Sequence, residues 1–242
     1  MVGIGGGAPK VPDIDIRLGD VVVSMPGGTG GAVVQYDYGK KTSDGIKRKG
    51  TLNNPPQELL TGVAAVRTSH MMKENSLKDF LLAIFQNHPG MKDEFKYQGV
   101  ENDRLFKTPY KHVGGSTCAN CDVKGEIKRS TRNNDNPCIF YGVIASGNLV
   151  WEESETRDQL RDEVGALCFE MEAAGLMNNF PCLVIRGICD YADSHENDRW
   201  QPYAAATAAA YAKNLLYVID SSKFKKLSSA ARVTGQFDMF VY

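Results

Sequence analysis

The 242-residue sequence lacks several features that would each place it in a particular class of protein. It has no excess of basic charge, because 28 Lys and Arg residues oppose 29 Asp and Glu residues and leave a formal charge of −1. Proteins that hold nucleic acid or an anionic membrane surface generally carry such an excess, so the balance argues against both kinds of partner. No apolar run approaches the roughly 20 residues that span a bilayer. No signal peptide precedes the first glycines.

Cysteine is also scarce, because six residues in a chain of this length do not make a disulfide-dense scaffold. Four of them lie in or beside apolar stretches, as small buried thiols do: Cys138, Cys168, Cys182 and Cys189. The other two form a single Cys118-x-x-Cys121 pair with His112 nearby. Zinc needs about four ligands, and no second pair stands at the spacing of a zinc ribbon or finger. We therefore expect plain thiols without a metal, no cofactor, and a soluble, reduced, cytoplasmic protein.

The sequence has no internal repeat; it has instead an alternation of strand-like and helix-like segments. Strands are expected over residues 20–24, 31–38, 139–144, 150–151, 166–171 and 181–189. Helices are expected from residues 55 and 76 onward and over 156–163, 172–177 and 203–219, the last of which is very rich in alanine. The near-continuous apolar character of the last two strands is typical of strands covered on both faces. The alternation predicts a layered α/β domain with a largely parallel sheet.

Three segments stand apart from this alternation. Residues 40–54 are polar and basic, and we expect a solvated loop there rather than a binding patch. Residues 90–137 are rich in Lys, Asn, Asp, Gly and Arg, which predicts an irregular excursion from the core or a flap. The chain is polar again from residue 221 to 242. We therefore expect one domain over residues 1–220, followed by a C-terminal tail.

Residues that could bind a ligand or react lie at three predicted strand ends. One is the glycine-rich turn at residues 3–8, and the others place two carboxylates, Glu172 and Asp190, directly after apolar strands. Ligands collect outside the C-terminal ends of strands in such sheets. A charge in that position is costly unless it is paired or used. The alternative is that each acid caps the helix that follows it; with both acids beside the glycine-rich turn, we favour a ligand site.

The glycine-rich turn also fits a dinucleotide-binding fingerprint, because Gly3, Gly5 and Ala8 match G-x-G-x-x-G/A. That motif needs a helix directly after it to present its N-terminus to pyrophosphate. Pro9 and Pro12 follow instead, and the next predicted strand begins too soon to leave room for a crossover helix. We therefore expect the turn to bring backbone N–H groups close to a small ligand, and we disfavour a dinucleotide oxidoreductase.

Three further residues have a structural explanation. Arg186 lies inside an apolar strand and must be paired, so we expect an internal salt bridge. Trp200 is expected to anchor the core or an interface. His195 follows Asp190 closely and could lie near a substrate, but a role at a helix start is favoured.

Five motifs stand in a characteristic order along the chain. They are the glycine-rich turn, Asp-Val-Val-Val-Ser (20–24), Ile-Ala-Ser-Gly-Asn (144–148), Phe-Glu-Met-Glu-Ala (169–173) and Arg-Gly-Ile-Cys-Asp (186–190). This order resembles the nucleoside phosphorylase/nucleosidase superfamily, which includes purine nucleoside and uridine phosphorylases and methylthioadenosine nucleosidases. The sequence over residues 168–177 and 185–195 is similar to the fungal branch, in which the domain is often fused to nucleotide-binding or ankyrin-repeat regions. The resemblance covers about residues 1–218.

The resemblance implies a three-layer αβα sandwich around a mixed, largely parallel central sheet, of the phosphorylase/hydrolase kind. It also implies that the family's first strands, which precede the glycine-rich turn, are absent here. Those strands supply an arginine that binds phosphate in phosphorylases or a glutamate that activates water in nucleosidases. Family members usually associate, so the resemblance further implies a homo-oligomer.

The resemblance also implies roles for individual residues. Asp190 falls where the family places the acid that protonates N7 of the departing purine, and Glu172 falls where a carboxylate holds the ribose hydroxyls. The other substrate-binding positions that it implies are Gly5, Gly6, Val150, Phe169, Glu170, Met171 and Cys189. These roles suit the chemistry, because glycosidic cleavage passes through an oxocarbenium-like state that a carboxylate stabilises. A half-buried Asp with a raised pKa can supply the proton that the leaving purine needs.

One position departs from the family pattern and bears on the nucleophile. Phosphorylases commonly have a phosphate-binding serine where this chain has Ile4, whose side chain binds no oxyanion. We therefore expect cleavage of the N-glycosidic bond of a purine nucleoside or nucleotide, with ATP and adenosine as candidates, by hydrolysis rather than phosphorolysis. Phosphate stays a second candidate partner. The alternative is a catalytically inactive purine-binding module for sensing or interaction.

Overall fold

The computed structural model describes residues 1–28, 30–42, 45–73, 77–115, 117–148, 153–195 and 198–219. Within these ranges, no helix combines the length and the apolar character needed to cross a membrane. Short strands alternate with helices along the chain, as the sequence pattern predicts, and the strands form one central sheet with a small separate hairpin.

The central sheet closes on itself. Its strands are β1 (Val2–Gly7), β2 (Val21–Ser24), β3 (Val33–Gln35), β6 (Ile139–Ser146), β7 (Ala166–Glu170) and β8 (Ile185–Asp190). Their order is β2-β8-β1-β7-β6-β3, and an additional β2–β6 pairing joins the two sides into a small closed barrel. The β1–β7 and β2–β8 pairings are antiparallel and the others in this sheet are parallel. The expected mixed, largely parallel sheet is confirmed.

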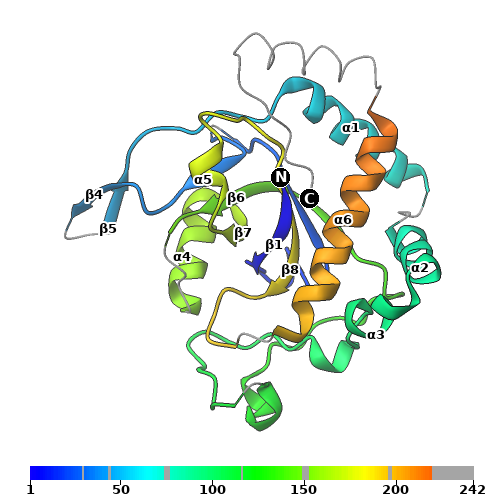
Figure 1. Cartoon of the computed structure of the whole chain (residues 1–242). Coiled ribbons are helices and arrows are strands. Elements are labelled where there is room, and N and C mark those ends of the chain that lie inside the picture. Colours follow the sequence, from blue (N-terminus) through cyan, green and yellow to red (C-terminus); the bar gives the residue numbers. More distant parts are fainter. Residues whose placement is uncertain are drawn as a thin grey trace.

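The closure corrects the expected three-layer sandwich. Helices do lie on two sides of the sheet, with α6 (Gln201–Val218) on one side and α4 (Ser154–Val164) and α5 (Ala173–Leu176) on the other (Figure 1). A sandwich, however, needs an open sheet, whereas β2 bonds to both β8 and β6. Pairing across the gap satisfies backbone groups that an open edge would leave free.

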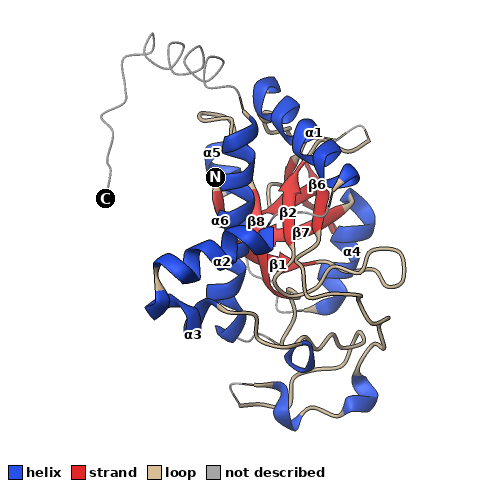
Figure 2. Ribbon diagram, turned by 90° about the vertical axis from the view of Figure 1, so that its right-hand side faces the viewer, coloured by secondary structure: helices blue, strands red, loops and turns tan. Residues whose placement is uncertain are grey.

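Further helices surround α6. They are α1 (Gln57–Met72), α2 (Leu77–Asn87) and the single turn α3 (Lys92–Phe95), and each contacts α6. The start of α1 directly after Pro56 agrees with the expected proline at a helix entry. Figure 2 shows the strands enclosed by these helices, with the long irregular segment gathered at one end of the barrel.

The alanine-rich composition of α6 has a steric reason. A Cβ atom placed on Gly187 of β8 would lie 1.8 Å from the carbonyl oxygen of Ala204, so the helix touches the strand backbone to backbone. Ala204, Ala208 and Ala210 are fully buried along α6. Only small side chains permit this approach, which places β8 firmly against the helix.

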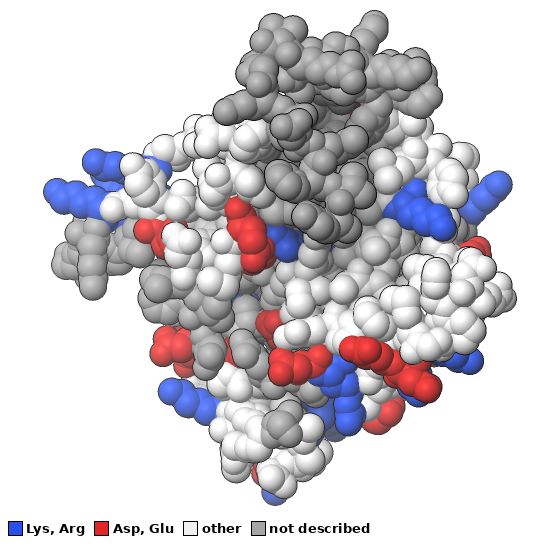
Figure 3. All heavy atoms as spheres, in the orientation of Figure 1, with Lys and Arg blue, Asp and Glu red and all other residues white. Residues whose placement is uncertain are grey.

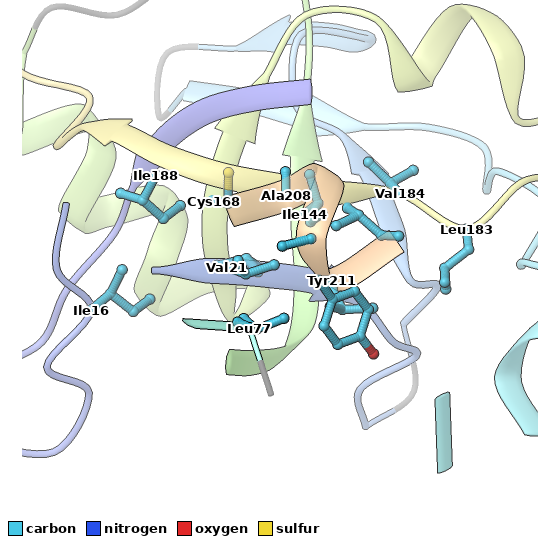
Figure 4. Packing of buried hydrophobic residues seen from close by; sticks show 14 of the residues in the cluster. Ile16, Val21, Leu77, Ile144, Cys168, Leu183, Val184, Ile188, Ala208 and Tyr211 are labelled. Carbon is cyan, nitrogen blue, oxygen red and sulfur yellow. The ribbon is translucent and has the colours of Figure 1, made fainter. Parts of the chain in front are cut away.

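The core lies between α6 and the barrel and inside the barrel. Val21 of β2, Ile144 of β6 and Tyr211 of α6 belong to one buried cluster, and Figure 4 shows them from close by. Burying each aliphatic side chain of this kind stabilises the fold by about 1.5–3 kcal/mol. Trp200 is also fully buried and donates its indole N–H to the carbonyl oxygen of Asn102, 3.2 Å away, as expected for a core anchor.

Two expectations for the polar segments need correction. Residues 40–54 were expected to be a loop, but β4 (Gly39–Thr42) and β5 (Gly45–Arg48) pair as an antiparallel hairpin that projects from the barrel (Figure 1). Cross-strand backbone bonds do not require apolar side chains, so polar composition predicted exposure but missed the pairing. Figure 3 shows basic side chains where the hairpin projects, and charges of both signs scattered over the rest of that face. The strand expected over 181–189 begins only at Ile185.

The segment from residue 90 to 137 is irregular, as expected, but it is anchored to the barrel. Its regular structure is limited to α3 and single turns at Pro89–Met91, Val100–Asn102, Cys118–Asn120 and Val123–Gly125. Arg132 of this segment donates two hydrogen bonds of 2.7 Å to the carboxylate of Asp20, directly before β2. The strand expected at 150–151 and the tail over 221–242 lie outside the described residues.

Candidate active site

A cavity of about 220 Å³ lies where the C-terminal ends of β1, β7 and β8 converge. Its lining residues are Ile4, Gly5, Gly6, Tyr36, Arg157, Leu160, Phe169, Glu170, Met171, Glu172, Cys189, Asp190, Ala192 and Gln201. Every residue to which the family resemblance assigns a catalytic or substrate-binding role lines this cavity except Val150, which lies outside the described residues. The fold thus gathers residues from three distant parts of the chain around one space.

Glycines on β1 allow the three strand ends to come together. A Cβ atom at Gly5 would lie 2.6 Å from the carbonyl oxygen of Phe169, and one at Gly6 would lie 2.6 Å from Oδ1 of Asp190. Real Cβ atoms do not approach other atoms so closely, so any side chain here would push β7 or Asp190 aside. The β1–β8 register also shifts between Gly5 and Gly6, which turns the end of β1 toward the cavity.

Asp190 ends β8 and is half-buried in the cavity wall. Its Oδ1 accepts a 2.7 Å hydrogen bond from the backbone N–H of Ala192, and its Oδ2 lies 3.0 Å from the thiol of Cys189. No ion pair to Asp190 is present among the described residues. Burial therefore dominates and raises the pKa of this carboxyl, with the nearby Asp193 adding to the effect. Such a group can hold a proton and donate it.

The Asp190 turn is held in an uncommon backbone conformation. Ala192 has φ 48°, in the left-handed region that a side chain other than that of glycine rarely adopts. The hydrogen bond from Ala192 to Asp190 closes this turn. The alternative that Asp190 caps a helix is not observed, because the carboxylate bonds to the turn residue instead.

Glu172 has a different environment on the same rim. Its Oε2 lies 2.6 Å from Nη2 of Arg186, and the same Nη2 donates to Oε2 of the buried Glu170. This confirms the internal salt bridge expected for Arg186. Gly3 makes room for it, since a Cβ atom there would lie 2.1 Å from Nη1 of Arg186. The Glu172 side chain remains 59% exposed, so its carboxylate is fixed by Arg186 and open to the cavity.

Glu170 performs the capping that the sequence offered as the alternative role for Glu172. The Glu170 carboxylate accepts hydrogen bonds from the backbone N–H groups of Glu172 and Ala173, at 3.1–3.2 Å, at the start of α5. Glu172 makes no such capping bond. Glu170 is therefore occupied by the helix and by Arg186, whereas Glu172 is held only by Arg186 and can face a ligand.

An aromatic pair forms another wall of the cavity. The ring of Phe169 meets that of Tyr36 edge to face, with centroids 6.0 Å apart. Burial, together with the charges of Asp37 and Glu170, raises the pKa of Tyr36 to about 12, so the phenol stays neutral. Met171 is 45% exposed at the mouth of the cavity. This combination of apolar rings and a few polar groups is typical of a small-molecule site.

Sequence reasoning missed five lining residues: the polar Tyr36, Arg157 and Gln201, and the apolar Leu160 and Ala192. Tyr36 follows β3, and its strand gave no sign of facing a site. Arg157 lies in the polar helix α4, where an arginine is unremarkable in sequence, yet it is buried and donates to Asp193 and to the backbone of Tyr191. The pairing of β3 with β6 places Tyr36 at the cavity, and the packing of α4 and α6 against the barrel brings in Arg157 and Gln201.

His195 lies beside a second cavity rather than in the first. Its ring is buried and stacks on Phe106 with centroids 4.1 Å apart, instead of standing at the start of a helix. The second cavity, of about 310 Å³, has Cys118, His195 and Asp190 in its lining. Among the described residues, one group could hold a metal ion: His112, Cys118 and Cys121, which the sequence treated as plain thiols with a nearby histidine.

Comparison with known proteins identifies relatives of this chain. The profile described as "Phosphorylase superfamily" matches residues 85–220. A nucleotide-binding leucine-rich repeat (NLR)-like protein from Hyaloscypha variabilis is 44% identical over 227 residues, which are 93% of this chain and 22% of that protein. A 5'-methylthioadenosine/S-adenosylhomocysteine nucleosidase from Mycobacterium bovis is 30% identical over 88 residues, 34% of each chain. The chain thus spans about a fifth and about a third of the lengths of these relatives.

Solved structures show a weaker likeness. Futalosine hydrolase of Helicobacter pylori matches with a TM-score of 0.48 and 18% sequence identity, over 89% of this chain and 65% of that one.

Proposed function

The chain belongs to the phosphorylase superfamily, and on that premise we propose that its strand-end cavity cleaves the N-glycosidic bond of a purine nucleoside or nucleotide. One observation carries the proposal. A carboxyl whose pKa burial raises, Asp190, shares the cavity with a carboxylate that an arginine holds in place and that is open to the cavity, Glu172. Glycosidic cleavage needs an acid that protonates the leaving group and a negative charge that stabilises the sugar.

Asp190 is the proposed acid. As the bond to the sugar breaks, the departing purine gains electron density and needs a proton at N7. Burial raises the pKa of Asp190 and so favours the protonated carboxyl, and the hydrogen bond from Ala192 fixes the direction of the carboxyl group. General acid catalysis of this kind is worth roughly 10²–10⁴ in rate.

Glu172 is the proposed partner of the ribose. Its carboxylate would accept hydrogen bonds from the ribose hydroxyls and stabilise the positive charge that grows on the sugar. Arg186 holds Glu172 in place, and the same guanidinium forms an ion pair with the buried Glu170. Met171, exposed beside Glu172, would pack against the sugar.

The base would lie against the aromatic wall. Phe169 offers an apolar ring that Tyr36 supports edge to face, and the backbone next to Glu170 lies alongside. Gly5 and Gly6 would form the floor, and Cys189 would contact the base close to Asp190. Val150 remains a prediction for this contact.

The lining favours water over phosphate as the nucleophile. Ile4 faces the cavity where a phosphate-binding serine would stand in phosphorylases. Among the described lining residues, Arg157 carries the only positive charge, and its guanidinium is already bonded to Asp193 and to the carbonyl of Tyr191. A phosphate ion would find few free donors, whereas a water molecule needs none of them.

The test is release of free base. The chain is incubated with adenosine, with ATP and with other purine nucleosides, each with and without inorganic phosphate, and the products are separated by chromatography. We expect free purine without phosphate and no sugar phosphate when phosphate is added. The Asp190→Asn chain serves as the blank. Absence of free base from every compound would overturn the proposal.

A second function, purine binding without turnover, is favoured by one comparison. The NLR-like relative is far longer than this chain, so the matching region there is one part of a multi-region protein. A part of this kind can sense a small molecule without consuming it. Heat release on titration with a nucleoside, together with no free base, would identify this function.

A further inference from the structure

A thiol–imidazole cluster lies beside the proposed active site, in the irregular segment. One ligand atom from each of His112, Cys118 and Cys121 can be chosen so that all three lie within 4.8 Å of one another. Both cysteines are buried, and both are free thiols. They pack with Phe106 in a small apolar group of their own. This spacing is that of ligands around one metal ion rather than of thiols scattered in a loop.

The loop that carries the cysteines is held in shape without any metal. The guanidinium of Arg104 donates to the carbonyl oxygens of both Cys118 and Cys121, the latter at 3.0 Å. The hydroxyl of Thr117 accepts the backbone N–H of Ala119 at 3.4 Å and so caps the turn between the cysteines. A binding loop fixed in this way loses little conformational freedom when an ion enters.

His195 supplies an independent observation that points to a ligand. Its Nε2 is buried and has no hydrogen-bond partner among the described residues. Its Nδ1 lies 3.2 Å from Oδ1 of Asp193, and Arg157 holds the other oxygen of that carboxylate. A carboxylate accepts from Nδ1–H and so leaves the lone pair on Nε2, which is the arrangement that orients metal-binding histidines. A buried lone pair without a partner is rare in proteins and calls for an explanation.

The ring of His195 lies next to that of His112, but its nitrogens are outside the group of three ligand atoms, so the His195 ring has to shift toward the ion on binding. The centroids of the two rings are 5.6 Å apart and their planes are perpendicular, at 89°. In a tetrahedral zinc site each imidazole centroid lies about 3 Å from the metal, which puts two centroids about 5 Å apart. The observed separation exceeds this by less than about 1 Å. The His112 ring nitrogens bond to the carbonyl of Thr117 and the N–H of Gly114, so binding exchanges one of these bonds for the metal.

We propose that Cys118, Cys121, His112 and His195 bind a structural zinc ion. Two thiolates and two imidazoles in a closed shell are the ligands that Zn²⁺ takes in structural sites. Three of them come from the irregular segment and the fourth follows β8, so the ion fastens that segment to the barrel. His195 and Cys118 line the same cavity as Asp190, which places the ion close to the proposed active site. The zinc site does not depend on the proposed function.

Cobalt replaces zinc in the test because its spectrum reports the ligands. The chain is freed of metal with a chelator under reducing conditions and titrated with Co²⁺. We expect one Co²⁺ per chain, a thiolate-to-cobalt charge-transfer band in the near ultraviolet, strong visible bands of tetrahedral cobalt, and stoichiometric displacement by Zn²⁺. A folded wild-type chain that shows no charge-transfer band would overturn the proposal without any variant.

Variants then assign the ligands. Cys118→Ser should weaken Co²⁺ binding at least tenfold and remove about half of the charge-transfer intensity, because one of two thiolates is lost. Cys182→Ser is the matched control, since that half-buried thiol lies outside the cluster, and it should leave both unchanged. His195→Gln should weaken binding about tenfold or more and reduce the visible bands while the charge-transfer band persists. A Cys118→Ser chain with an unaltered spectrum would refute the site, and an unaltered His195→Gln chain would refute the fourth ligand.

Discussion

Two buried aspartates, Asp20 and Asp190, sit next to strands of the same barrel and differ in what surrounds them. Asp20 is 1% exposed. Its carboxylate accepts hydrogen bonds from both Nη atoms of Arg132, each at 2.7 Å, and from the backbone N–H groups of Arg17 and Cys138. Asp190 accepts one backbone N–H and a thiol, and it has no ion pair in the described part of the chain. Burial raises the pKa of both carboxyls, but Arg132 and the backbone donors around Asp20 favour its ionised form, whereas Asp190 lacks an arginine partner.

The difference extends to the segments that the two residues serve. Arg132 belongs to the irregular segment, so the Asp20 pair fixes that segment against the barrel. Asp190 instead lines two cavities. The comparison predicts that stability depends on Asp20 and activity on Asp190.

The largest expected effect is on turnover. Asp190→Asn keeps the oxygen that accepts the Ala192 N–H but cannot donate the carboxyl proton, so base release should fall by roughly 10²–10⁴-fold. Below pH 3.8, where the carboxyl is neutral in both the folded and the unfolded wild type, the free energy of unfolding of this variant should stay within about 1 kcal/mol of the wild type, because a neutral amide replaces a neutral carboxyl. Base release is measured by chromatography and unfolding by urea titration. Full activity in this variant would refute the role of Asp190 as the acid.

The reverse pattern is expected at Asp20. Asp20→Asn leaves the partly buried Arg132 without its counter-ion and removes the charged acceptor of the buried hydrogen bonds, which should cost about 3 kcal/mol of unfolding free energy in a urea titration. Asp162→Asn is the matched control, because that carboxylate is exposed and paired with Lys10 at the surface, and it should change stability far less. Equal stability of the Asp20 and Asp162 variants would show that the Asp20 pair does not hold the segment.

Burial raises the pKa of both carboxyls, so the effect of Asp190 on the pH dependence is read from the difference between the wild type and Asp190→Asn. The pKa of folded Asp190 is raised above its ordinary value of 3.8, so the folded state binds the proton more tightly than the unfolded state. The wild type should therefore lose unfolding free energy relative to Asp190→Asn as pH rises from 3.8 through the folded pKa. The loss is about 1.4 kcal/mol for each pH unit between the two pKa values, and it should level off above that window.

The same proton governs activity. Base release should decline on the alkaline side of the raised pKa, because ionised Asp190 has no proton to give. Urea titrations of both chains across the pH range, with rates measured in parallel, check both trends. A stability difference that does not change with pH would show that Asp190 has an ordinary pKa.

The smallest expected effect on stability is at Glu172. Glu172→Gln should cost at most about 1 kcal/mol, because the side chain is 59% exposed and Arg186 keeps its buried partner Glu170. Its effect on activity should be larger, since an amide stabilises positive charge on the ribose less well than a carboxylate does. Glu170→Gln is the contrasting variant, with a larger loss of stability. If the Glu172 variant were the less stable of the two, the assignment of these acids would be reversed.

Much of the fold could be predicted from local patterns. β-Branched residues placed β2, the alanine-rich stretch placed α6, and the apolar runs before Glu172 and Asp190 placed the ends of β7 and β8. The family resemblance, including its fungal branch, is confirmed. The site roles, the homo-oligomer and the choice between water and phosphate remain predictions.

Other features could not be predicted because they depend on distant segments. The β2–β6 pairing that closes the barrel joins residues more than a hundred positions apart, and no composition rule encodes it. The same holds for Tyr36 and Arg157 at the cavity, and for His195 against Phe106. The hairpin over 39–48 was missed for a different reason, since its strands pair without an apolar face.

The sequence by itself determined which chemistry the chain carries: two acids at strand ends beside a glycine-rich turn, an arginine in an apolar strand, and a cysteine pair near a histidine. The tertiary structure decided which of these groups are free. Arg132 reaches Asp20 from 112 residues away, Arg186 divides its charge between Glu170 and Glu172, and neither reaches Asp190. A side chain's type is local, but its ionisation and its partners depend on which charges and donors the folded chain brings within a few ångströms.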